Sequence, residues 1–322
     1  MTGTTKLTIP RDRVALNAIQ WINVKADPND PDSDNLWLYA EPTFKDEYPR
    51  VLAQIREAGF GAVMMEVLAS QTLQNYRRML DDAGLKPAPG YASITLPEDH
   101  GVSLGEPAAR IRWFDGIRRK AEESSFFGLS TIFLAPEVSW EPGTIRTLES
   151  SAIGASFDSG RLDRVIDIVG EAAEVLRAEG IRAGLHNHVG TWIETEGEID
   201  RALADIPADL LGASFDLGHL AWAGIDPATI VARYRDRIVD LHIKDLDLSV
   251  AEASRATPTP YNVASDRGLF LEPGLGGIDI AGTLAELGDD WDGWIIVEVD
   301  KASMEPFESA RVSWNWVDET FK

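Results

Sequence analysis

The sequence predicts an α/β fold, a (β/α)8 TIM barrel formed by a single domain that spans residues 1–322. Short apolar runs alternate with longer amphipathic stretches in eight consecutive strand–helix units. Runs such as TIFLA (131–135) and LGASF (211–215) are apolar at nearly every position, which is typical of parallel strands buried on both faces. Right-handed crossovers close such units into a barrel. A doubly wound open sheet is the competing architecture, but no G-x-G-x-x-G motif follows the first strand.

The eight units follow one another in order along the chain. Strands are predicted at residues 14–19, 62–67, 86–91, 130–135, 182–186, 212–216, 238–243 and 294–299. Helices are predicted at residues 45–59, 71–84, 105–127, 161–179, 197–205, 226–235, 278–287 and 305–320. In the first helix, Tyr48, Val51 and Ile55 recur at spacings of three and four, so they share one face that packs on the strands.

Composition and charge exclude several classes of protein. The chain has 30 Lys and Arg against 53 Asp and Glu, a formal net charge of −23, which argues against nucleic-acid binding because phosphate requires a cationic face. Cysteine is absent, so disulfides and thiolate chemistry are excluded. No apolar run approaches the roughly 18 residues that cross a bilayer. The first residues carry no apolar signal segment, so we expect a cytoplasmic protein that contacts neither nucleic acid nor membrane.

Two connections are too long to be simple turns. Residues 24–43 follow the first strand and residues 246–277 follow the seventh. Loops of this length are usually functional, and connections that follow strands lie on the catalytic face of a barrel. We therefore predict that both are rim or lid elements. The alternative is surface decoration or an oligomer contact, and we expect a homo-oligomer.

Imidazoles and carboxylates fall at the carboxyl ends of the last four strands. His186, Asp216, His242 and Glu298 come from strands five, six, seven and eight. These positions converge at one mouth of a barrel, and a group of nitrogen and oxygen donors at one point is a typical ligand set for a divalent cation. We predict one metal ion held by these four residues, with Mn preferred, followed by Co, Fe, Zn and Mg. A dication also removes the repulsion between two buried carboxylates.

Three further polar residues follow the same strands. His188 lies two positions after His186, so it replaces His186 as the ligand or acts as a neutral base beside the metal. His219 follows Asp216 by three residues and binds substrate, orients a ligand or takes a role at a helix start or in a loop. Lys244 follows His242 by two residues and anchors a substrate oxygen or donates a proton, unless it only forms a salt bridge. We predict His188, Glu298, Lys244 and His219 as catalytic residues.

Acidic and aromatic residues after other strands form a candidate substrate site. Glu66 lies late in the second strand and Glu137 just follows the fourth. Trp192 and Trp222 lie in loops after the fifth and sixth strands, where aromatic faces suit the C–H faces of sugar or polyol rings. Packing between helices and barrel is the alternative role for both tryptophans. We predict these four as substrate-binding residues.

Several segments together resemble a known family. They are LHNHVGT (185–191), FDLGHLAWAG (215–224), LHIKD (241–245), PGLGGID (273–279) and WIIVEVD (294–300). They resemble the xylose-isomerase-like TIM-barrel superfamily of sugar isomerases and epimerases, and within it the inosose (2-keto-myo-inositol) dehydratases. The resemblance covers roughly residues 14–316 and is strongest over 181–300. Its D-x-G-H and H-x-K-D pair is specific for the superfamily but not for one reaction.

The resemblance implies a single divalent metal, often Mn or Co, held by residues from strands five to eight. Many epimerases of this superfamily have Glu on strand five, where this chain has His186 in the H-x-H-x-G-T form of the dehydratase branch. A symmetric epimerisation with two opposed bases is therefore disfavoured. Glu298 matches the strand-eight Glu as ligand and as acid or base, and substrate specificity is expected in 246–277.

The reaction implied by the resemblance is proton abstraction next to a ketone. The substrate would be a keto-sugar or keto-polyol of carbohydrate metabolism and inositol catabolism. His188 or Glu298 would take the proton, and loss of a β-hydroxyl aided by Lys244 or His219 would complete a dehydration. Return of the proton to the neighbouring carbon would give a sugar isomerase or epimerase instead. A second alternative is a lyase that cleaves 3-keto-glycosides, including C-glycosides, together with a small partner subunit.

Overall fold

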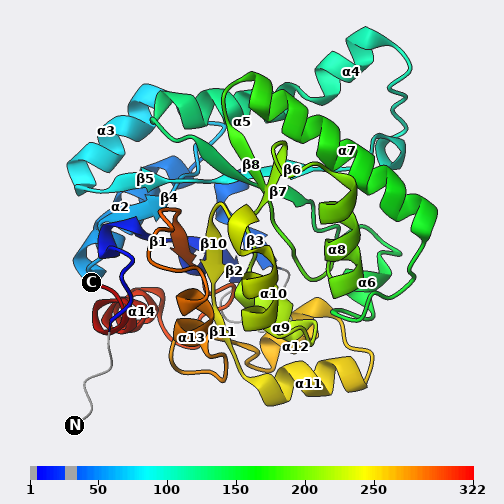
Figure 1. Ribbon diagram of the computed structural model, residues 1–322. Coiled ribbons are helices and arrows are strands. Elements are labelled where there is room, and N and C mark those ends of the chain that lie inside the picture. Colours follow the sequence, from blue (N-terminus) through cyan, green and yellow to red (C-terminus); the bar gives the residue numbers. More distant parts are fainter. Residues whose placement is uncertain (1–5, 26–34) are drawn as a thin grey trace.

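The structure is a computed structural model that describes residues 6–25 and 35–322. Within these ranges, nine parallel strands lie at the centre of the molecule, and helices surround them (Figure 1). One sheet has the order β10-β13-β1-β4-β5 and the other the order β6-β7-β8-β9. Their bounds are β1 Val14–Leu16, β4 Ala62–Met64, β5 Lys86–Ala88, β6 Tyr91–Ile94, β7 Thr131–Pro136, β8 Arg182–Leu185, β9 Leu211–Ala213, β10 Leu241–Ile243 and β13 Ile295–Val297.

The two sheets are parts of one ring. β5 and β6 are the two pieces of the predicted third strand, separated by two residues. On the other side, isolated parallel bridges join Ala213 to Ile238 and Asp216 to His242, with hydrogen bonds from the amide of His242 to the carbonyl of Phe215 (2.9 Å) and from Val239 to Ala213 (2.8 Å). The strands therefore follow chain order around the ring, and the predicted (β/α)8 barrel is confirmed.

Side chains of each strand alternate between two apolar regions, as the pleat requires. In β1, Val14 and Leu16 belong to the large core that the helices cover, whereas Ala15 belongs to a small separate cluster with Phe133 and Ile296. The other members of the small cluster are Ala62, Met64 and Ala88, which come from β4 and β5. It lies directly beside the polar residues described below, because the Phe133 ring is 4.2 Å from the imidazole of His242.

The outer helices are amphipathic, as predicted. Tyr48, Val51, Leu52 and Ile55 of the first outer helix are buried, and this helix ends at Gly59, whose φ of 124° requires glycine. The main helices are α2 Phe44–Ala58, α3 Leu73–Ala83, α4 Pro107–Trp113, α5 Asp115–Phe126, α7 Ser159–Ala178, α8 Glu196–Asp205, α10 Pro227–Tyr234, α13 Ile280–Ala285 and α14 Pro306–Thr320. Short helical segments are η1 Arg11–Arg13, α1 Ile19–Ile22, η2 Leu38–Ala40, η3 Pro97–His100, α6 Ile145–Leu148, α9 Leu217–Trp222 and η4 Arg235–Arg237. In the described part of the chain, no helix combines the length and the apolar character needed to cross a membrane.

The predicted helix 105–127 is wrong in one respect, because it is divided at Phe114. The first piece, α4, buries no residue, whereas α5 buries Ile117 and Ala121 against the barrel. The break lets the second piece pack without the first. The short helix α9, which begins at Leu217 after three intervening residues, was not among the predicted helices, although a helix start was one alternative for His219.

The long connections carry structure of their own. Within 24–43, β2 (Asn23–Lys25) and β3 (Asn35–Trp37) form an antiparallel pair, and the remaining residues 26–34 lie outside the described residues. Segment 246–277 contains α11 (Leu248–Ala256), α12 (Tyr261–Asp266) and β12 (Phe270–Leu271), which pairs with β11 (Asp245–Leu246). A third long connection, 137–158 after β7, was missed by the sequence analysis and includes α6.

Candidate active site at the carboxyl ends of the strands

The structure brings the four predicted metal ligands together at the carboxyl ends of neighbouring strands. His186 directly follows β8, His242 is the middle residue of β10 and Glu298 directly follows β13. Asp216 follows β9 by three residues and caps α9 by accepting a hydrogen bond from the amide of His219 at 3.1 Å. We call these four residues the buried cluster, since each is no more than 2% exposed.

The donor atoms of the buried cluster lie close to one another. One donor atom each of His186, Asp216 and His242 lies within 4.8 Å of the other two. Glu298 joins them through its Oε2 atom, which is 2.9 Å from Nδ1 of His242. Distances of this size allow one ion to contact all four side chains.

Lys244 lies inside a group of carboxylates. Its ammonium nitrogen is 2.8 Å from Glu298 Oε1, 3.0 Å from Asp216 Oδ2 and 2.5 Å from Asp300 Oδ1. These three carboxylates raise the pKa of Lys244 even though burial opposes its charge. One ammonium cannot neutralise all the carboxylates around it, so negative charge remains that a bound cation would balance.

Burial and neighbouring charges set the protonation states of His186 and Glu298. Burial lowers the pKa of His186 well below its usual range, with a further contribution from His242, so this imidazole is neutral. Burial alone would raise the pKa of Glu298, but Lys244 and His242 lower it well below its usual range. A neutral imidazole and an ionised carboxylate are the protonation states that bind metals.

An unsatisfied atom supports the fit of a cation. Asp216 Oδ2 is buried and has no hydrogen-bond partner among the described residues, although the ammonium of Lys244 lies 3.0 Å from it. Burial raises the pKa of Asp216, with Lys244 opposing the shift. The donor set, its excess negative charge and the unpartnered carboxylate oxygen together fit a divalent metal ion.

A second group lies beside the buried cluster. His188, His219 and Asp300 place donor atoms within 4.8 Å of one another, and the two imidazole rings are 3.7 Å apart. Burial lowers the pKa of His188 to about 3, with Lys244 as the next cause, and burial also lowers the pKa of His219. Burial raises the pKa of Asp300 to about 7 against the effect of Lys244.

Segment 246–277 closes over this second group through Tyr261 of α12. The Tyr261 hydroxyl donates to Asp300 at 2.9 Å, and its ring stacks on His188 at 5.9 Å with an interplanar angle of 10°. The segment predicted to hold specificity therefore contacts the predicted base directly. Tyr261 and Asp300 were both missed, although Asp300 follows Glu298 by two residues and so shares its face of the strand.

Two other contacts of the cluster were also missed by the sequence analysis. The hydroxyl of Tyr91, the first residue of β6, is 3.1 Å from His186 Nε2 and 3.0 Å from His242 Nδ1. The amide of Asn17, which directly follows β1, donates to Glu298 Oε2. In the sequence, both residues lie at or beside a strand of the ring, and this position could have indicated them. A single Tyr or Asn at such a position is too common to indicate a site.

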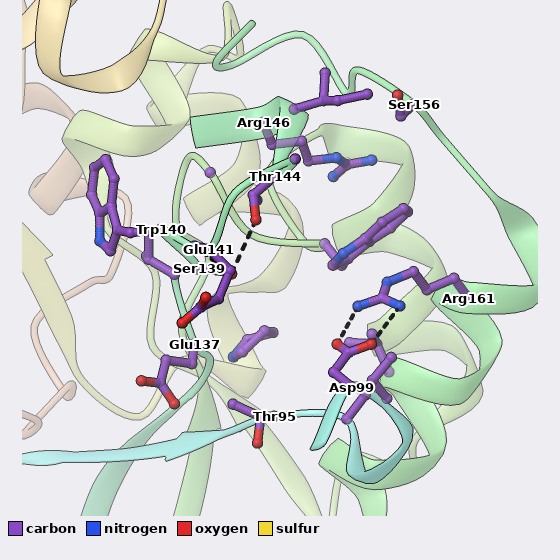
Figure 2. Close-up of a pocket in the computed structure, with 18 of the residues that line it drawn as sticks. Thr95, Asp99, Glu137, Ser139, Trp140, Glu141, Thr144, Arg146, Ser156 and Arg161 are labelled. Atoms are coloured by element: carbon purple, nitrogen blue, oxygen red, sulfur yellow. Dashed lines mark hydrogen bonds and ion pairs between the residues drawn. The ribbon is translucent and has the colours of Figure 1, made fainter. Parts of the chain in front are cut away.

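An open cavity of about 800 Å³ lies beside the ends of β6, β7 and β8 (Figure 2). Glu137 and Trp192, two of the predicted substrate residues, line it together with Trp140. Among the described residues that line the cavity, none belongs to the buried cluster. The link between the two regions is Trp140, whose ring contacts Tyr261 edge-on at 5.5 Å.

Two arginine side chains hold one wall of the open cavity in place. The guanidinium groups of Arg146 and Arg161 lie 4.5 Å and 4.9 Å from the centre of the Trp192 ring. Arg146 is buried and forms two hydrogen bonds with Glu198 of α8. Arg161 forms two hydrogen bonds with Asp99 (Figure 2). These contacts hold the Trp192 ring in place as part of the wall.

The other two predicted substrate residues lie in different surroundings. Trp222 is fully buried, donates a hydrogen bond to Ser254 at 2.9 Å and packs on Tyr261. Its role is therefore to support the position of Tyr261. Glu66 forms an ion pair at 3.1 Å with Lys120 of α5, a helix of the outer layer, and burial raises its pKa.

Comparison with known proteins agrees with the fold and the motifs. Residues 52–320 match the family described as Xylose isomerase-like TIM barrel, and the chain belongs to this family. An inosose dehydratase from Geobacillus kaustophilus (strain HTA426) is 28% identical over 319 residues, which are 97% of this chain and 95% of that protein. The resemblance read from the motifs is confirmed at this level.

Two solved structures share the fold. The IOLI protein with a bound zinc atom aligns with a TM-score of 0.61 at 12% identity, over 95% of this chain and 97% of that one. A xylose isomerase-like TIM barrel protein from Mycobacterium smegmatis in complex with magnesium aligns with a TM-score of 0.64 at 18% identity, over 97% of each chain. At these identities the likeness concerns the fold alone.

Proposed function

We propose that this protein is a divalent-metal-dependent lyase that removes water from a keto-polyol of the 2-keto-myo-inositol type. The observation that carries the proposal is a neutral, partly exposed imidazole, His188, placed beside a buried set of two imidazoles and two carboxylates. The similarity to an inosose dehydratase over nearly the whole chain supports the choice of substrate class.

His186, Asp216, His242 and Glu298 would hold the ion. A divalent ion there supplies a positive charge that polarises the ketone and stabilises the negative charge formed when a neighbouring proton leaves. We keep Mn as the expected metal, although zinc and magnesium are the ions bound in the two structures of the same fold. Reconstitution with Mn, Co, Fe, Zn and Mg in turn tests that choice.

His188 is the best-placed base. Its Nδ1 atom is 2.7 Å from the carbonyl of Val189, which can only accept, so Nδ1 carries the hydrogen and Nε2 keeps a free lone pair. Glu298, the alternative base, is already engaged by Lys244, His242 and the amide of Asn17. We therefore assign proton abstraction to Nε2 of His188.

Elimination also needs a proton for the departing hydroxyl. The imidazolium formed on His188 can return its proton to a hydroxyl on the same face of the substrate, so one residue serves both halves of the reaction. Lys244 keeps its proton because its pKa is raised, so we assign it to holding a substrate oxygen beside the carboxylates. His219, with Nε2 at 3.3 Å from Lys244, is then the residue that orients the ammonium.

The open cavity is the proposed route and binding surface for the substrate. Its exposed Glu137 can accept hydrogen bonds from hydroxyl groups, and Trp140 and Trp192 offer aromatic faces. A cavity of about 800 Å³ is larger than one six-membered ring requires and lies toward the upper end of the usual range for small-molecule pockets. That volume favours a 3-keto-glycoside as the second candidate substrate. An epimerase is less well supported, because His186 stands where a second opposed base would be.

The test is turnover of 2-keto-myo-inositol by protein stripped of metal and then reloaded with one metal at a time. Loss of activity on stripping and recovery with a divalent ion would support the proposal. Full activity in the metal-free protein would refute it. Turnover of a 3-keto-glucoside without turnover of the keto-inositol would move the assignment to the second candidate.

A further inference from the structure

Tyr91 reaches the buried cluster from the opposite part of the ring. Its hydroxyl oxygen is 3.1 Å from His186 Nε2, 3.0 Å from His242 Nδ1 and 3.5 Å from Glu298 Oε2. Its ring packs against both imidazoles, with centroids 5.0 Å and 5.1 Å away, and against Phe133 at 5.8 Å. The phenol oxygen therefore contacts three of the four proposed ligands at once.

The orientation of His186 shows what its ring offers to Tyr91. Nδ1 of His186 is 3.1 Å from the carbonyl oxygen of Ser214, which can only accept a hydrogen bond. The hydrogen of the neutral imidazole is therefore on Nδ1, and the lone pair on Nε2 is directed at the side on which the Tyr91 oxygen lies. This lone pair is the one that a metal would use.

The spacing of these atoms is that of ligands around one ion. Two donors about 2.1 Å from a single metal and about 90° apart are roughly 3.0 Å from each other. The distances from the Tyr91 oxygen to the two imidazole nitrogens, and the 2.9 Å between His242 Nδ1 and Glu298 Oε2, all fall near this value. An ion bound by His186 and His242 would lie within bonding reach of the phenol oxygen.

We propose that the hydroxyl oxygen of Tyr91 is a fifth protein donor of the metal site, with His186, Asp216, His242 and Glu298. The inference rests on the metal site of the proposed function and adds a hard oxygen donor from strand three. Such a donor shifts the preference of the site from zinc toward Mn and Fe. If Tyr91 only held the imidazoles by hydrogen bonds, it would be a positioning residue without a bond to the metal.

Tyr91→Phe separates these roles, because it removes one oxygen and keeps the ring that packs on Phe133. The matched control is Tyr76→Phe, since Tyr76 is also buried and hydrogen-bonded but lies in the Tyr39–Tyr48–Tyr76 group near α2 and α3. Wild-type protein and both variants are stripped and titrated with Mn(II), and separate samples are loaded with Fe(III). A tyrosine that binds iron(III) as a phenolate, after its hydroxyl proton is released to the buffer, gives a charge-transfer absorption band in the visible range, which a hydrogen-bonding tyrosine does not give.

We expect the visible band in the wild type and in Tyr76→Phe, and its loss in Tyr91→Phe. We also expect the dissociation constant for Mn(II) to rise about 10–100-fold in Tyr91→Phe alone. Absence of the band in iron-loaded wild type, or its persistence in Tyr91→Phe, would overturn the inference and leave the proposed function intact. Failure of the wild type to bind any divalent metal would instead refute the proposed function.

Discussion

The two halves of the barrel mouth differ in how they use charge. In the buried cluster, His186, Asp216 and His242 have no exposed surface, and burial lowers the pKa of His186 and raises that of Asp216. Around the open cavity, Glu137 is exposed and Trp140 is 45% exposed. Reactive protonation states require exclusion of water, whereas substrate recognition requires an accessible surface. The contrast therefore divides the proposed site into a chemical half and a binding half.

This division predicts that substitutions in the two halves impair different steps, and the largest effect is expected at Asp216. In Asp216→Asn, one of the charges that balance the ion is lost while the cap on α9 is kept, because an amide oxygen also accepts from the amide of His219. We expect metal affinity to fall by more than about 100-fold and turnover to become undetectable, with an unchanged far-ultraviolet circular dichroism spectrum. Stoichiometric metal in the purified variant would contradict the assignment of Asp216 as a ligand.

His188→Gln should leave metal binding intact and remove the base. We expect kcat to fall by about 10²–10⁴-fold while the metal content stays at the wild-type level. The measurement is turnover of the keto-polyol beside metal analysis of the same sample. A variant that loses its metal would show that His188 is a ligand in place of His186, which is the alternative that the sequence left open.

In the binding half, Trp140→Ala should weaken binding without slowing the chemistry. Loss of one aromatic face is expected to raise KM about tenfold and to leave kcat unchanged. Trp37→Ala is the matched control, because Trp37 of β3 is also 45% exposed and does not line the cavity. Equal effects of the two substitutions would remove the open cavity from the proposed substrate site.

The contrast also explains what could be predicted from the sequence. His186, Asp216, His242 and Glu298 could be brought together because each lies near the carboxyl end of a strand, and the carboxyl ends of barrel strands are neighbours. Tyr91 and Tyr261 could not, since their contacts depend on side-chain direction and on the path of the 246–277 segment. The 137–158 connection was missed because its apolar residues show no helical or strand periodicity. Glu66 was predicted to lie at the barrel mouth, although its carboxylate forms an ion pair with Lys120 of an outer helix.

The smallest expected effect concerns stability and comes from the lowered pKa of His188. Because burial holds the pKa of His188 at about 3, the unfolded chain takes up a proton below about pH 6.5 that the folded chain does not bind. This contribution to stability is present above pH 6.5 and is lost as the pH falls toward 3. In metal-free protein, the free energy of unfolding of the wild type should therefore fall relative to that of His188→Gln between pH 7 and pH 5, as measured by urea denaturation. A constant difference over this range would mean that water reaches the imidazole of His188. His188 would then belong to the binding half of the site instead of the chemical half.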